Sequence, residues 1–125
     1  MVLIDSNYIL RFLTMTPKEH FEISKSLFED VAKGEMDIII SEGVVMEVYF
    51  VLSKFYKWEK EKIVNKLTAI LEFKSVVNED KTVLIYTLNI LKKHNIDFID
   101  ALLCAKANFY GYEVRSFDKD IQKCL

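Results

Sequence analysis

The residues best suited to chemistry in this chain are two aspartates, Asp97 and Asp100, in the stretch DFIDALLCAKA. They are three residues apart, so both carboxylates lie on one face if the stretch is helical. Ala101 and Cys104 are small and sit where the acids point, which lets this end of the helix approach a sheet closely. A purely structural alternative is that Asp97 caps the helix and Asp100 adds a favourable charge to its first turn.

Three other acids occupy comparable positions. Asp5 directly follows the apolar run VLI, and Asp118 directly follows the run EVRSF. Glu47 lies on or beside the apolar face of a helix predicted over residues 42–55, where a carboxylate is costly unless a cation or hydrogen-bond donor meets it. Ordinary alternatives exist for each residue, because Asp5 and Asp118 can cap helices and Glu47 can lie on an exposed flank.

Alternating apolar runs and helical periodicities define the elements that must position these acids. The predicted strands are residues 2–5, 36–40, 75–77 and 113–117. The predicted helices are residues 6–13, 18–32, 42–55, 58–73, 79–95 and 97–110, with a short one at 120–125. This alternation indicates an open, mainly parallel α/β sheet with helices on both sides. Ligands gather at the carboxyl ends of such strands, so all four acids can reach one edge.

Composition limits the classes of protein to consider. With 125 residues and 51% hydrophobic content, the chain fits one domain, residues 1–125. Its net charge of −2 does not indicate binding to nucleic acid or to an anionic membrane. We expect no signal peptide and no membrane span. Cys104 and Cys124 lack CxxC spacing and an adjacent histidine, so we expect buried or free thiols in a reducing cytoplasm. His20 and His94 are isolated and are assigned to neither catalysis nor metal binding.

Four convergent carboxylates predict a bound cation. Crowded carboxylates repel one another and raise each other's pKa unless a cation neutralises them. Oxygen ligands without histidine or cysteine suit Mg²⁺ or Mn²⁺ rather than zinc. Such an ion can supply hydroxide and stabilise a leaving oxyanion, so the chemistry inferred is metal-dependent phosphodiester hydrolysis.

The ordered set of acidic motifs resembles a known family. Asp5 in VLIDSN, Glu47 in VVMEVYFVL, Asp100 in DFIDALLCAKA and Asp118 in SFDKDI resemble the motifs of PIN-domain proteins, especially VapC-like toxin ribonucleases. The resemblance implies a three-layer α/β/α fold with four or five short strands in the order 3-2-1-4. It also implies an endoribonuclease dependent on Mg²⁺ or Mn²⁺, a homodimer, and a cognate antitoxin that inserts residues into the acidic pocket.

The same resemblance implies roles for individual residues. Asp5, Glu47 and Asp100 would be metal ligands, Asp118 the fourth acid, and Ser6, Asn7 and Ser116 polar supports, with Asp97 nearby in a supporting position. The family often has a Thr-x-Asn-x-x-Asp pattern at the last strand, whereas SFDKD offers two acids here. Asp118 and Asp120 therefore compete for the fourth role, and Asp118 is favoured because it is nearer the strand end.

The sequence allows two alternatives for RNA cleavage and two for a cluster of aromatic residues. A PIN-fold module that binds RNA or a protein without cleaving is the main alternative to a nuclease. A cluster of aromatic residues indicates either core packing or a contact with a second copy or an antitoxin. Its members are Tyr49, Phe50, Phe55, Tyr56 and Trp58.

Overall fold

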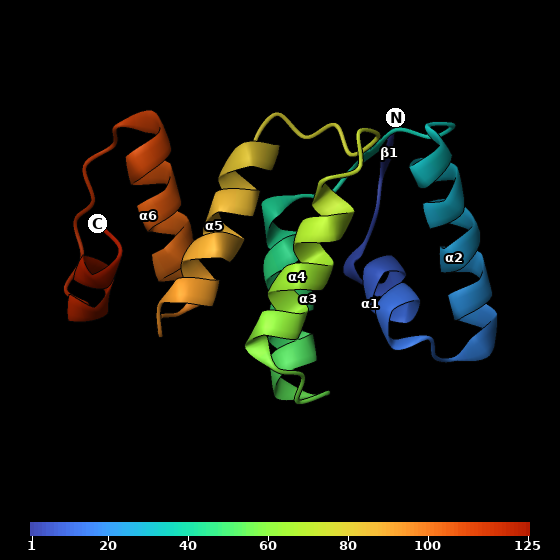
Figure 1. Ribbon diagram of the computed structural model, residues 1–125, viewed down its shortest axis with the longest axis horizontal. Coiled ribbons are helices and arrows are strands. Elements are labelled where there is room, and N and C mark those ends of the chain that lie inside the picture. The colour runs from blue at the N-terminus through green and yellow to red at the C-terminus, as the bar shows by residue number, and fades with distance from the viewer. The chain divides into compact units, whose positions relative to one another are not determined.

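The computed structural model describes residues 1–125, which form two compact units (Figure 1). The unit of residues 1–79 contains β1 (Val2–Leu3), α1 (Ser6–Thr14), α2 (Lys18–Lys33), β2 (Ile38–Ile39), α3 (Glu42–Lys54) and α4 (Lys60–Leu71). The unit of residues 80–125 contains α5 (Lys81–Lys93), α6 (Phe98–Tyr110) and the 3₁₀ helix η1 (Lys119–Lys123). None of these helices combines the length and the hydropathy that crossing a lipid bilayer requires. The expectation of one domain over the whole chain stays a prediction.

The sheet is small and lies in the first unit. β1 pairs in parallel with β2, with Val2 opposite Ile38 and Leu3 opposite Ile39. On its other side, β2 meets the segment around Val76 through a single parallel bridge from Ile38. Two regular strands and one bridge therefore form where three strands were expected, and the predicted order of four strands is not confirmed.

α1 begins at the carboxyl end of β1 because Asp5 caps it. Asp5 is in an extended conformation, and its carboxylate accepts a hydrogen bond from the Ser6 backbone N–H at 2.7 Å. Ile9 is fully buried on the inner face of α1. α2 packs beside α1, where the Phe12 and Phe28 rings lie 4.6 Å apart (Figure 1). Asp5 thus lies between the end of β1 and the start of α1, and α1 packs against α2.

α3 follows β2 in the same way. The Ser41 hydroxyl accepts a hydrogen bond from the Val44 N–H at 3.4 Å and starts the helix. Val48 and Leu52 are fully buried, and α3 packs against both α1 and α4. Glu47 precedes Val48 and is exposed, so it lies at the edge of the packed face, as its flank alternative allowed.

The second unit is built on the packing of α5 against α6, which lie side by side (Figure 1). Leu84, Leu88 and Leu91 of α5 and Ala101 of α6 are fully buried. Ala101 and its small neighbours on α6 allow a close approach between the helices. η1 then folds back onto α6, where it buries Ile121.

Residues 113–117 form no regular secondary structure, although a fourth strand was expected there. α6 ends at Gly111, whose φ of 74° is left-handed and suits a residue without a side chain. The unit of residues 80–125 contains no strand, so the segment has no strand partner within its own unit. A strand without a partner backbone cannot form ladder hydrogen bonds.

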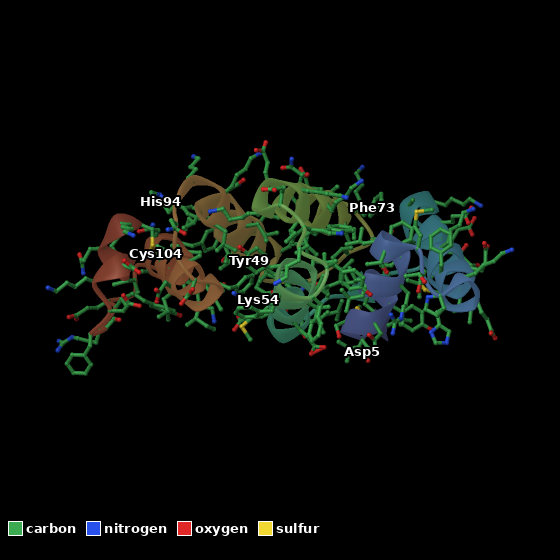
Figure 2. All side chains as sticks on the ribbon, turned by 90° about the horizontal axis from the view of Figure 1, so that it is seen from below. Asp5, Tyr49, Lys54, Phe73, His94 and Cys104 are labelled. Carbon is green, nitrogen blue, oxygen red and sulfur yellow. A yellow bond between two sulfur atoms is a disulfide. The ribbon has the colours of Figure 1, made fainter.

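The expectation of free thiols is wrong, because Cys104 and Cys124 form a disulfide and no free cysteine is left (Figure 2). The return of η1 along α6 brings their Cα atoms to 5.9 Å, within the range that a disulfide spans. The two cysteines are 20 positions apart in sequence, so their spacing did not indicate this contact. The disulfide ties the C-terminal segment to the helix that bears Asp100.

Candidate functional site

The first cluster of candidate residues is Asp5, Ser6 and Glu47, all in the unit of residues 1–79. The Ser6 hydroxyl donates to Glu47 Oε1 and lies 3.3 Å from Asp5 Oδ1. Ser6 is 2% exposed, whereas both acids are exposed. A buried hydroxyl therefore joins two exposed acids that are 42 residues apart in sequence.

Asn7 follows this cluster on the first turn of α1, and its side chain is exposed. The three consecutive residues at the start of α1 therefore have different roles. Asp5 caps the helix, Ser6 connects the acids, and Asn7 faces the neighbouring helix α2 across a cavity.

The second cluster surrounds Asp100, in the unit of residues 80–125. Asp100 lies in the first turn of α6 and is only 9% exposed. Desolvation by burial raises the pKa of its carboxyl, and the charge and hydrogen bond of Asp118 raise it further. Asp97 and Asp120 add smaller repulsions in the same direction. Four acids thus contribute to one negative region on this unit.

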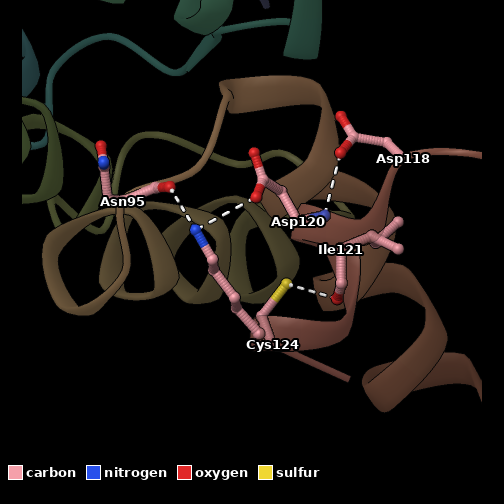
Figure 3. A network of polar contacts seen from close by, with 6 residues as sticks. Asn95, Asp118, Asp120, Ile121 and Cys124 are labelled. Atoms are coloured by element: carbon pink, nitrogen blue, oxygen red, sulfur yellow. Dashed lines mark hydrogen bonds and ion pairs between the residues drawn. The ribbon is translucent and has the colours of Figure 1, made fainter.

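The contacts of Asp118 and Asp120 separate their roles (Figure 3). The Asp120 carboxylate lies 3.1 Å from the Lys123 ammonium, which neutralises it at the surface. The Asp118 carboxylate accepts from the Asp120 N–H at 2.9 Å and interacts with Asp100. Asp118 is therefore the acid with the larger effect on Asp100. Which of the two is the fourth acid stays a prediction.

Two supporting residues flank this cluster. Asp97 is the N-cap of α6 by position, but its side chain makes no capping hydrogen bond. Ser116 accepts a hydrogen bond from the Asp118 N–H at 3.0 Å, so its hydroxyl orients the backbone that carries Asp118. The structure thus places every predicted acid and support in one of two groups, with Asp5 and Glu47 in one unit and the remaining acids in the other.

Each group suits a hard cation but is incomplete for one. Within neither unit do three or more His, Cys, Asp or Glu side chains converge closely enough to hold a metal ion. The available ligands are carboxylate oxygens, as Mg²⁺ and Mn²⁺ prefer. A buried Asp100 with a raised pKa is also a group that a nearby cation would stabilise in its charged form.

The raised pKa of Asp100 makes a prediction about stability. Its pKa in the folded state lies above its ordinary value of 3.8, so the folded protein binds more protons than the unfolded chain between these two values. The free energy of unfolding therefore falls as the pH rises through that window. We expect Asp100→Asn to be more stable than wild type at pH 7 in EDTA, and to lose this advantage below about pH 3.8. Thermal melting at both pH values measures the difference.

A matched control for that experiment is Asp37→Asn, which alters an exposed aspartate outside both clusters. It is expected to leave the melting temperature nearly unchanged at both pH values. If Asp100→Asn melted below wild type at pH 7, Asp100 would contribute favourable contacts that outweigh its desolvation, and the expected gain in stability would be refuted.

Three features were missed or left open by the sequence. The Cys104–Cys124 disulfide was missed, and so was a cavity between α1 and α2 that Arg11 and His20 line. Only the four-residue spacings on α1 and α2 hinted at that cavity. The aromatic cluster divides, because Phe50, Phe55 and Tyr56 are exposed, and the other two are half-buried.

Comparison with known proteins adds evidence over nearly the whole chain. Residues 2–124 match the family model of the PIN domain. The chain is 29% identical over 124 residues to a VapC ribonuclease of Aquifex aeolicus (strain VF5), covering 98% of this chain and 91% of that protein. No solved structure gives a significant match.

Proposed function

Because the chain belongs to the PIN-domain family, we propose that it is a metal-dependent endoribonuclease, the toxin of a toxin–antitoxin pair. The observation that carries the proposal is the hydrogen-bonded link from Ser6 to Asp5 and Glu47. It gathers two acids from distant parts of the chain at the carboxyl end of β1. The similarity to a protein named VapC ribonuclease supports the choice of RNA as substrate.

We further propose that the two acidic groups act as one site. In this arrangement residues 113–117 pair beside β1 as the fourth strand, giving the order 3-2-1-4 in a three-layer α/β/α domain over residues 1–125. Support comes from β1, which pairs on one side with β2 and has no other strand partner in its unit. Neither group alone brings together the three or more side chains that a metal site needs. In this proposal Asp5, Glu47, Asp100 and Asp118 supply them jointly.

The chemistry divides among the residues as follows. A bound Mg²⁺ or Mn²⁺ supplies charge neutralisation and a water of lowered pKa. Asp5, Glu47 and Asp100 would hold the ion, and Asp118 would complete the acidic site. Ser6 orients Asp5 and Glu47 by its hydroxyl, while Ser116 orients the backbone at Asp118. These are positioning residues, because they act through the acids rather than on the RNA.

The partners follow from the same proposal. A toxin of this kind works in the cytoplasm, is a homodimer, and is restrained by a protein antitoxin. The exposed side chains of Phe50, Phe55 and Tyr56 on and after α3 are the proposed contact surface. A disulfide such as Cys104–Cys124 is uncommon in cytoplasmic proteins outside hyperthermophiles.

The alternative function is a PIN-fold module that binds RNA or a protein without cutting. It is favoured less, because a binding module has no electrostatic reason to keep a buried, destabilised Asp100 beside Asp118. Metal binding separates the two functions. A non-cleaving module needs no cation at the acids, whereas the nuclease does.

We expect Mg²⁺ or Mn²⁺ to raise the melting temperature of the purified chain, because an ion that binds only the folded state stabilises it. At 100 times the dissociation constant the gain is about 2.7 kcal/mol. Asp5→Asn and Asp100→Asn should each abolish the rise, one from either group, whereas Asp37→Asn should retain it. A rise that survives one of these two substitutions would show that the groups do not share an ion.

A further inference from the structure

A cavity of about 310 Å³ lies between α1 and α2, within the unit of residues 1–79. It is lined by Asn7, Tyr8, Arg11, His20, Ile23 and Ser24. The volume is at the lower end of the range for small-molecule sites. Both helices contribute residues four apart, Asn7 with Arg11 and His20 with Ser24, so polar side chains face the cavity from both walls.

Arg11 is the unusual residue in this cavity. Its Nε is buried and has no hydrogen-bond partner. A buried N–H without a partner is unfavourable, because it has lost its hydrogen bonds to water without replacing them. A native protein rarely keeps such a group without a ligand, an ion or a water to meet it. Arg11 lines the cavity and its side chain as a whole is only half-buried, so a group there that accepts hydrogen bonds can contact it.

The lining residues indicate the charge of that group. Every polar side chain around the cavity can donate a hydrogen bond, and none of the lining residues is a carboxylate. A guanidinium binds oxyanions in a fixed fork geometry and is the usual choice for phosphate. Tyr8 and Ile23 add exposed ring and aliphatic surface, 37% and 53% exposed, against which a ribose or base can pack. The combination matches one nucleotide.

The position of the cavity connects it to the acidic site. Asn7 lines the cavity and is two residues from Asp5, and Arg11 lies about 6 Å further along α1 at 1.5 Å per residue. An RNA strand whose backbone passes Asp5 can therefore continue along α1. We propose that this cavity binds the phosphate of an RNA nucleotide flanking the cleavage position, with Arg11 as its main ligand. This inference rests on the proposed function, since it takes RNA as the substrate.

The test measures binding without cleavage. A fluorescein-labelled RNA hexanucleotide is titrated with the full chain in EDTA, at several KCl concentrations, and followed by fluorescence anisotropy. The variants are Arg11→Gln and His20→Gln, with Lys25→Gln as the control, because Lys25 is an exposed cation of α2 outside the cavity. EDTA leaves the acids equally unneutralised in all four proteins, so their differences report the cavity.

We expect Arg11→Gln to weaken RNA binding about tenfold and to reduce the slope of log affinity against log salt by about 0.7, the value for one phosphate contact on a single strand. His20→Gln should weaken binding less, and Lys25→Gln should change neither quantity. Inorganic phosphate should compete with the RNA for wild type more than for Arg11→Gln. His20 is exposed, so its variant keeps the test valid if Arg11→Gln fails to fold.

Three results would overturn the inference. These are equal affinity and slope for wild type and Arg11→Gln, an equal loss in Lys25→Gln, and binding of a labelled hexaglutamate peptide at Arg11 without binding of RNA. Cleavage is scored separately with Mn²⁺. A chain that binds RNA through Arg11 but never cuts it would refute the proposed nuclease and support RNA binding in the cavity. A chain that cuts RNA equally well with Arg11→Gln would support the nuclease and refute RNA binding in the cavity.

Discussion

Replacing Asp5 or Asp100 with asparagine is expected to lower the rate constant of RNA cleavage about a thousandfold, which corresponds to about 4 kcal/mol of transition-state stabilisation. Each change removes one charged ligand oxygen while keeping the size of the side chain. Asp5 is the carboxylate linked through Ser6 to Glu47, and Asp100 is the buried carboxyl beside Asp118. Single-turnover cleavage of a defined RNA, with protein in excess, measures the effect.

The control for these variants is Asp37→Asn, which removes an exposed carboxylate outside both clusters and should cleave as wild type does. Fold is checked by thermal melting, where Asp100→Asn should be at least as stable as wild type in EDTA at pH 7. A loss confined to one of the two variants would place the chemistry in one acidic group alone. That outcome would contradict the shared site.

Removing the Cys104–Cys124 disulfide is expected to lower the free energy of unfolding by about 3 kcal/mol. The bond closes a segment with a sequence separation of 20 residues, so the oxidised unfolded chain has less conformational freedom. Urea denaturation of Cys104→Ser/Cys124→Ser against wild type measures the loss. A serine pair is the matched replacement, because it keeps the side chains nearly the same size.

Dithiothreitol provides the internal control for the disulfide. Reduction should shift wild type to the stability of the double-serine variant and should leave that variant unchanged. Two free thiols found by alkylation and mass measurement in the untreated wild type, together with no effect of reductant, would show that the bond does not form in the purified protein.

Helix positions were the most predictable part of this chain. α2 begins at Lys18 as expected and ends at Lys33, because apolar residues recur at helical spacing and Gly34 forms the left-handed cap after it. α3 begins after the predicted Ser41 cap. These signals are local, since they involve residues within one or two turns of each other, and a sequence displays them directly.

Long-range pairings were the least predictable part. The expected strand at residues 113–117 depends on a partner from a distant segment, and the unit that contains it has none. The disulfide depends on η1 turning back along α6, which no spacing of Cys104 and Cys124 reveals. The cavity at Arg11 likewise needs α1 and α2 to pack together before its six lining residues meet.

The candidate acids were predictable in their positions but not in their contacts. Their types and their positions after apolar runs were visible in the sequence. The structure adds the hydrogen bonds and ion pairs that each acid makes. Ser6 joins Asp5 to Glu47. Asp118 affects Asp100 more than Asp120 does, and Asp120 pairs with Lys123. A hydrogen bond across 41 residues, or an ion pair between two side chains of η1, follows from packing and not from a motif.

The most direct test of the proposed nuclease is incubation of the purified chain with a mixed pool of single-stranded and structured RNA in Mn²⁺, with mapping of the cut positions. We expect discrete cuts that disappear in EDTA and with Asp100→Asn. Intact RNA in the presence of a folded protein with bound Mn²⁺ would contradict ribonuclease activity on these substrates and would favour the non-cleaving module.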